Sequence, residues 1–72
     1  MKYYDIIFTD NSSGNMGKSQ VWVEALDKKE ALRIVAQSLS TNRLKVKVDD
    51  LQVWGCREVP EGICQKIIKY QG

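Results

Sequence analysis

The sequence of 72 residues contains no histidine, only two cysteines and no long apolar run. The lack of histidine removes the side chain that most often acts as a general base near neutral pH. A zinc site needs about four Cys, His, Asp or Glu ligands, and Cys56 and Cys64 with scattered acids do not supply them. Either thiol would also lack the imidazole partner of a typical cysteine nucleophile. We therefore expect no enzymatic activity, no catalytic residue, no metal and no cofactor.

The small number of cysteines and the first residues of the chain predict a cytoplasmic protein. A small secreted domain stabilised by disulfides would have more than two cysteines. Acidic residues interrupt the apolar residues that follow Met1 and Lys2, which is unlike a signal peptide. A membrane-spanning helix needs roughly 18 or more apolar residues in a row, and the chain has no such run. We expect two reduced thiols and no membrane partner.

The length of the chain bounds the number of domains, and its net charge bears on the kind of partner. The 72 residues fit a single small domain, residues 1–72, and a domain of this size buries only about 60 % of its unfolded surface. The net charge is +2, from 11 basic and 9 acidic side chains. This charge is too small to indicate a nucleic-acid binder, and it does not exclude one.

The clearest pattern is a strand that runs directly into a capped helix. Apolar and polar residues alternate over 20–25, as in a half-buried strand. Asp27 follows as the predicted N-cap, and Glu30 completes a variant of the capping box. The helix is expected to end near residues 38–41, with Asn42 as a left-handed stop. The apolar residues at helical spacing are Ala31, Leu32, Ile34, Val35, Ala36 and Leu39.

Residues 23–32 read Val-Glu-Ala-Leu-Asp-Lys-Lys-Glu-Ala-Leu. This junction resembles the strand-to-helix junctions of many small bacterial and phage proteins. The resemblance implies a compact accessory protein of a bacterium or a mobile element, and it implies no activity.

The rest of the chain contains further strand patterns. Residues 2–9 alternate and are rich in aromatic and β-branched side chains, which predicts the first strand. Residues 10–17 are rich in Asn, Ser and Gly and predict a hairpin loop. Two interpretations remain open for the segment after the helix. Either 44–48 and 51–57 are two strands around an Asp-Asp turn, or only 51–57 is a strand, and residues 51–57 carry the stronger strand pattern.

The C-terminal residues predict a second, short amphipathic helix. Pro60 suits the first turn of a helix, and Ile63, Ile67 and Tyr70 then share one stripe. Gly62 weakens such a helix by roughly 0.5–1 kcal/mol relative to alanine. The helix therefore needs a surface on which to pack.

Together the elements predict an α+β fold. We expect a two-layer sandwich with an antiparallel sheet of three or four strands, in the order β-β-α-β(-β)-α. The order of the strands within the sheet is not predicted. The first helix is expected to cover the sheet face that carries Tyr4, Ile6, Phe8, Val21, Val23, Leu51 and Val53.

Gly17 and Lys18, followed by Ser19, resemble the end of a phosphate-binding loop. That motif needs a glycine where this chain has Ser12, and it needs a helix where this chain has a strand. We therefore interpret the segment as a hairpin loop without a nucleotide site.

The second face of the sheet is the main candidate for function. Tyr3, Ile7, Trp22 and Trp54 are expected to project from the side opposite the first helix. Such a cluster is too apolar for ordinary surface. Three interpretations remain open: the C-terminal helix covers the face, a protein partner or a second copy binds it, or single-stranded nucleic acid stacks on its rings.

The sequence leads to an order of preference among partners. A protein partner or a homodimer comes first, single-stranded nucleic acid second, and an orphan enzyme a distant third. Basic residues at the rim could contact phosphates, but Asp5, Glu24 and Glu58 are expected in the same neighbourhood. The expected binding residues are Tyr3, Ile7, Trp22, Trp54, Lys45, Lys47 and Arg57, with Lys18 and Arg43 as further basic residues at the rim.

Overall fold

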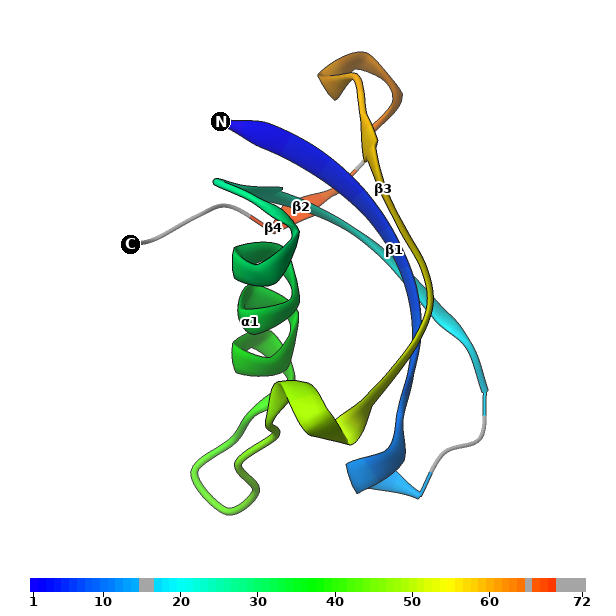
Figure 1. Ribbon diagram of the computed structural model, residues 1–72. Coiled ribbons are helices and arrows are strands. Elements are labelled where there is room, and N and C mark those ends of the chain that lie inside the picture. Colours follow the sequence, from blue (N-terminus) through cyan, green and yellow to red (C-terminus); the bar gives the residue numbers. More distant parts are fainter. Residues whose placement is uncertain (15–16, 65, 69–72) are drawn as a thin grey trace.

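The computed structural model describes residues 1–14, 17–64 and 66–68 (Figure 1). No helix within these residues is long and apolar enough to cross a membrane. The elements, in chain order, are β1 (Lys2–Asp10), the 3-10 helix η1 (Asn11–Ser13), β2 (Ser19–Ala25), α1 (Lys28–Leu39), the 3-10 helix η2 (Val48–Asp50), β3 (Leu51–Val59), the 3-10 helix η3 (Glu61–Ile63) and β4 (Ile67–Ile68).

The four strands form one mixed sheet in the order β3-β1-β2-β4. The central strand β1 pairs antiparallel with β2 and with β3, so β2 and β3 run parallel to each other. Parallel strands need a crossover connection, and α1 provides it. The strand β4 pairs parallel with β2. The predicted α+β class is confirmed, whereas the predicted antiparallel sheet is wrong because β4 pairs parallel with β2 and makes the sheet mixed.

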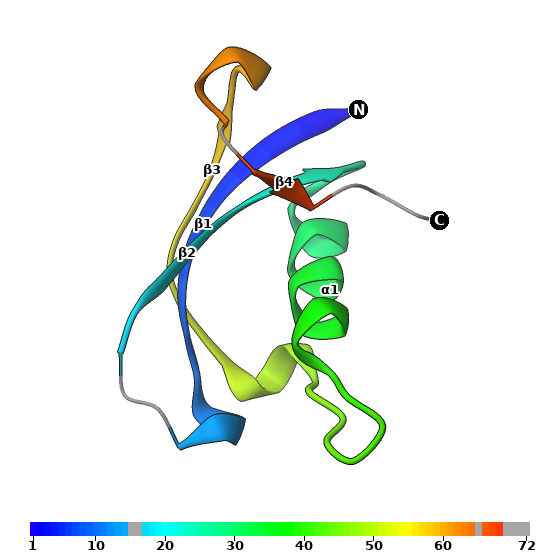
Figure 2. The ribbon, with the colours of Figure 1, turned by 180° about the vertical axis from the view of Figure 1, so that it is seen from behind.

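The sheet curves around α1, which lies on its concave side (Figures 1 and 2). Alternation along β1 directs Tyr4, Ile6 and Phe8 toward the helix, and Ile6 is fully buried. Val53 was expected in this core but is 39 % exposed, because it lies on the edge strand β3. The buried cluster comprises Tyr4, Ile6, Phe8, Val23, Ala25, Ala31, Ile34, Val35, Ala36, Val46 and Leu51.

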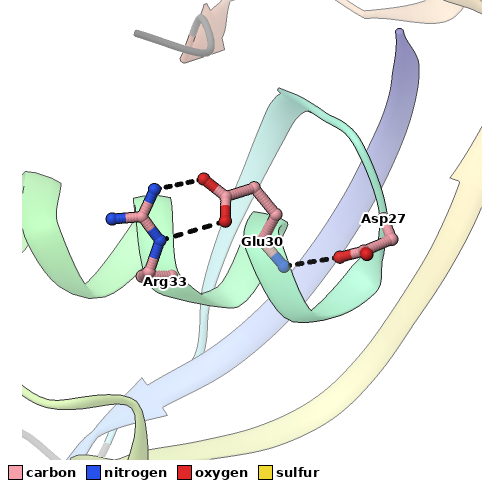
Figure 3. A network of polar contacts seen from close by, with 3 residues as sticks. All are labelled: Asp27, Glu30 and Arg33. Atoms are coloured by element: carbon pink, nitrogen blue, oxygen red, sulfur yellow. Dashed lines mark hydrogen bonds and ion pairs between the residues drawn. The ribbon is translucent and has the colours of Figure 1, made fainter. Parts of the chain in front are cut away.

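The N-terminus of α1 has half of the predicted capping box. The Asp27 carboxylate accepts a hydrogen bond from the backbone N–H of Glu30 at 2.8 Å, as expected of an N-cap. The Glu30 carboxylate binds the Arg33 guanidinium instead of the Asp27 amide (Figure 3). The second half of the predicted box is therefore replaced by an ion pair one turn into the helix.

The C-terminus of α1 is held by a serine rather than by a left-handed residue. Ser40 is an extended C-cap with ψ of 144°. Its hydroxyl donates to the carbonyl of Ala36 and accepts from the N–H of Val46, both at 2.9 Å. Among the described residues no residue other than glycine has a positive φ, so the predicted stop at Asn42 is wrong. Ser40 instead links the helix end to Val46, which joins the core.

The segment after the helix follows the second of the two interpretations. Residues 44–47 form a connection rather than a strand, and η2 occupies the place of the expected Asp-Asp turn. In η2 the Asp50 carboxylate accepts from the backbone N–H of Lys47 at 2.9 Å. The predicted strand at 51–57 is confirmed and extends to Val59.

The predicted C-terminal helix is wrong over the part of the chain that the structure describes. Pro60 precedes a single 3-10 turn, and Ile67 and Ile68 form a short strand against β2. A short helix is marginal without packing, and Gly62 weakens it further. The β-branched pair gains ladder contacts with β2, and Ile68 packs against the core. Tyr70, which was expected on the helix, lies outside the described residues.

The described residues between β3 and β4, 60–64 and 66, lie on the convex side of the sheet and are called the crossing segment (Figures 1 and 2). Val59 pairs with Tyr3 and is only 8 % exposed, although it does not belong to the cluster under α1. Its burial on the convex side is explained by the crossing segment. The C-terminal residues thus cover one end of the second face, as one interpretation required, but without a helix.

Candidate functional site

The convex face of the sheet brings together five of the seven predicted binding residues. Tyr3 and Ile7 come from β1, Trp22 from β2, and Trp54 and Arg57 from β3. Directly paired residues of antiparallel strands share a face. The pairs on this face are Tyr3 with Glu24 and Val59, Asp5 with Trp22 and Arg57, Ile7 with Gln20 and Gly55, and Thr9 with Gln52.

The other two predicted residues, Lys45 and Lys47, lie elsewhere. They belong to the connection 40–47, which extends past the C-terminal end of α1 on the concave side of the sheet (Figure 1). The sequence could not place them, because strand order and the path of this connection depend on tertiary contacts. The convex face therefore lacks the basic rim that these lysines were expected to supply.

Trp54 is the most exposed aromatic side chain on the convex face, with 52 % of its surface accessible. It occupies a β-bulge: Ile7 pairs with Gly55 and the next residue, Phe8, pairs with Val53. The extra residue turns the indole over the central strand, where its Nε1–H donates to the Thr9 hydroxyl at 3.0 Å. The ammonium of Lys18 lies 4.3 Å from the ring centroid, within the range of a cation–π contact. The indole is thus held in place by two partners.

Ile7 and Gly55 form the middle of the convex face. Ile7 is 36 % exposed even though β1 is the central strand. Gly55 lies beside it, and a Cβ built on this glycine would meet nothing within 4 Å. The missing side chain leaves bare backbone between Ile7 and the edge of the sheet.

Asp5 is a buried carboxylate in the same face, with 6 % of its surface exposed. The Nε2 of Gln20 donates to its Oδ1 at 2.8 Å, and the Arg57 guanidinium lies 3.4 Å from its Oδ2. Side chains from both neighbouring strands thus satisfy the carboxylate. Arg57, predicted as a binding residue, therefore contacts a buried carboxylate while its own side chain remains 74 % exposed.

Tyr3 lies at the end of the face that the crossing segment covers. Its hydroxyl donates to the Glu24 carboxylate at 3.1 Å. This hydrogen bond, with burial and the nearby Glu61, raises the pKa of Tyr3 to about 12. The contact with Glu61 of η3 shows that the crossing segment reaches this part of the face. Tyr3 is half-buried and is therefore less accessible to an external partner than Trp54.

A groove of about 470 Å³ lies at the other edge of the convex face, beside β2. Its lining residues come from β2 and from the segment that leads into β4. They are Gln20, Val21, Trp22, Lys66 and Ile68. Trp22 is half-buried and belongs both to this groove and to the convex face.

The next feature of this surface is its set of possible metal ligands and thiols. Among the described residues no group of three or more His, Cys, Asp or Glu side chains is arranged to hold a metal ion. Cys56 pairs with Ile6 and packs against the core, whereas Cys64 lies close enough to Asp5 for that charge to raise its pKa, after burial as the main cause. The arrangement presents an aromatic and apolar surface with satisfied polar groups.

Comparisons with known proteins add no neighbour to this description. The chain matches no family model, no curated protein and no solved structure.

Three features of the site were missed by sequence reasoning. They are the bulge at Trp54, the open space over Gly55, and the pairing of Asp5 with Gln20. Gly55 interrupts the alternating pattern of residues 51–57, and an isolated glycine in a strand indicates either a bulge or a close approach of another backbone. That signal was present in the sequence. The contact of Asp5 with Gln20 depends on strand register, which the hairpin loop does not reveal.

Proposed function

We propose that this protein is a binding domain that contacts a protein partner through Trp54, Ile7 and the bare backbone of Gly55 on its convex face. The observation that carries the proposal is the open space above Gly55, between an exposed indole and an exposed isoleucine. Exposed aromatic side chains are typical anchors of protein interfaces.

Gly55 has no role in the fold that requires a glycine. Its φ is not positive; in the described chain Gly14 is the glycine with a positive φ. An added Cβ would meet open space. Glycine inside a strand costs roughly 0.5–1 kcal/mol relative to alanine, so its presence weakens β3 without any gain in backbone geometry. A glycine inside a strand marks either a bulge or the close approach of another backbone. Gly55 borders the bulge at Trp54, but its φ is not positive, so we attribute the cost to the close approach of a partner.

The charges of the face favour a protein over a nucleic acid. Lys18 and Arg57 are offset by Asp5 and Glu24, and no net positive charge remains among these four groups. Arg57 already faces Asp5, and Lys18 lies over the Trp54 ring on which a base would stack. Binding of single strands relies on unpaired cations beside open aromatic rings. The contacts of Lys18 and Arg57 within the protein therefore favour a protein partner.

The test is site-specific photo-crosslinking in cells that express the protein. A benzophenone amino acid at Gln52, an exposed position beside Thr9, samples the convex face. We expect a protein adduct of one defined mass, which Trp54→Ala and Gly55→Val each reduce at least tenfold. Gly55→Val should keep or raise the melting temperature, so that loss of the adduct cannot follow from unfolding.

Leu44→Ala serves as the matched control. Leu44 is 43 % exposed and lies in the connection 40–47, away from the convex face. The proposal predicts an unchanged adduct in this variant. An adduct that survives both convex-face variants would refute the proposal, and a nuclease-sensitive adduct would replace it with nucleic-acid binding. An adduct with the mass of two copies would identify a homodimer as the partner, which sedimentation velocity of the purified protein would confirm.

A further inference from the structure

The outer edge of β2, on the side away from β1, pairs with another strand over only two residues. The two-residue strand β4 pairs only with Trp22 and Val23, and no described strand lies beside the outer edge of 19–21. Ser19 and Gln20 are exposed and Val21 is half-buried. Figure 2 shows β4 beside one end of β2, while the rest of its outer edge continues alone.

The two edges of the sheet differ in their protection against pairing with another chain. The β3 edge carries the bulge at Trp54 and the adjacent charges of Arg57 and Glu58, and bulges and charges are devices that block edge-to-edge pairing. The β2 edge has an unbroken register with β1 and no charge or proline from residue 19 to residue 21. Within the described residues no strand pairs with the backbone of 19–21 on this side, and Lys66 lies beside Gln20 and Val21 in the groove.

We propose that this edge of β2 binds an extended acidic peptide of another protein by strand addition. In this mode the backbone supplies hydrogen bonds and alternate side chains enter flanking pockets. The groove beside β2 provides such a pocket: Val21 and Ile68 supply its apolar wall, and Trp22 borders it on the convex side. The site is separate from Trp54 and Gly55 and does not depend on the function proposed above.

Charge selects the chemistry of the peptide. Lys66 is the charged residue among those that line the groove, and it is exposed. An acidic side chain in the added strand would neutralise it. A symmetric pair of β2 edges from two copies would instead bring Lys66 of one copy toward Lys18 of the other, twice over, because such an interface is isologous. An acidic peptide is therefore a better occupant than a second copy.

The experiment begins with a displayed library of random ten-residue peptides, selected against the whole protein. We expect enriched peptides that alternate apolar and acidic residues. A synthetic peptide of the enriched sequence should protect amides of residues 19–21 from hydrogen exchange, as measured by NMR. Lys66→Glu should weaken its binding at least tenfold, whereas Lys29→Glu, an equal charge change on the exposed side of α1, should change it less than twofold.

Backbone pairing is tested on the peptide, which leaves the protein intact. Methyl groups on one alternate set of peptide nitrogens should abolish binding, and methyl groups on the other set should leave it unchanged, because only one set faces β2. Equal effects of both sets, enrichment without acidic residues, or amide protection away from residues 19–21 would overturn the proposal. Trp54→Ala should not affect binding of the peptide. Failure of the strand-addition proposal is therefore distinguishable from failure of the convex-face proposal.

Discussion

The pKa of Tyr3 reports on the polar contacts at one end of the convex face. Its hydrogen bond to Glu24 is the largest cause that raises its pKa to about 12. The folded state therefore holds the phenol proton more tightly than the unfolded state, in which the pKa is about 10. The stabilisation from this proton is complete below pH 10 and is lost as the pH rises toward 12.

Glu24→Gln removes the carboxylate, so the pKa of Tyr3 should fall toward the ordinary value. NMR titration of the tyrosine Cζ resonances measures it, and Tyr3→Phe identifies the resonance. An unchanged pKa in Glu24→Gln would mean that burial or Glu61, rather than Glu24, sets the titration of Tyr3.

The N-terminus of α1 depends on a single capping side chain. The Asp27 carboxylate accepts from the first turn, and Glu30 is engaged by Arg33 rather than by the cap. We predict that Asp27→Ala lowers the free energy of unfolding by about 1 kcal/mol, within the roughly 0.5–2 kcal/mol range of N-cap losses. Urea denaturation followed by circular dichroism measures the change, and Asp27→Asn, which retains the acceptor, should lose much less.

Glu30 adds a small pH dependence to the same helix. The hydrogen bond from Arg33 is the largest cause that lowers the pKa of Glu30. The ion pair therefore contributes above the usual pKa of a glutamate, and its contribution is lost as the pH falls through the lowered value. The Arg33 side chain is 49 % exposed and that of Glu30 is 19 % exposed, so water and salt reach the pair, and the effect should be minor and should weaken in high salt. Urea denaturation of Glu30→Gln and of the unmodified protein should give the same free energy of unfolding at low pH.

In β3, a substitution at Gly55 is expected to raise the free energy of unfolding. Gly55→Ala places a methyl group in open space on a backbone that does not need glycine. We expect the free energy of unfolding to rise by about 0.4–1 kcal/mol, with the change measured by thermal and urea denaturation. A loss of stability would show that the bulge at Trp54 needs the freedom of a glycine, and would remove the main support for the convex-face proposal.

The same elements show what sequence reasoning can and cannot reach. The alternation in β1 and β2 and the cap at Asp27 were predicted because each depends on neighbours along the chain. The strand β4 was not predicted, because two residues are too few to show an alternating pattern. Pairing with β2 and, for Ile68, packing against the core hold this strand in place. The convex face was predicted from Tyr3, Ile7, Trp22 and Trp54 by alternation, and the bulge at Trp54 left its indole on that face. Lys45 and Lys47 were misplaced because the path of their connection is set by the contact of Ser40 with Val46.

At the scale of the whole molecule, the sheet separates the two thiols. Cys56 shares the concave side with Ile6 and packs against the core, whereas Cys64 lies on the convex side near Asp5. Burial is the main cause that raises the pKa of both thiols, so few thiolates form at neutral pH. A disulfide needs the two Cα atoms within about 7 Å and the side chains directed at each other. The fold does not satisfy the second condition.

We therefore predict that the native protein forms no intramolecular disulfide. After incubation with oxidised glutathione, alkylation and mass spectrometry should find two free thiols in the folded chain, apart from any mixed disulfide with glutathione. The same treatment in denaturant should link Cys56 and Cys64, since only seven residues separate them and short loops close readily in an unfolded chain. A linked species that forms without denaturant and keeps the native circular dichroism would show that the crossing segment leaves the convex face, and with it the cover over Val59 and Tyr3.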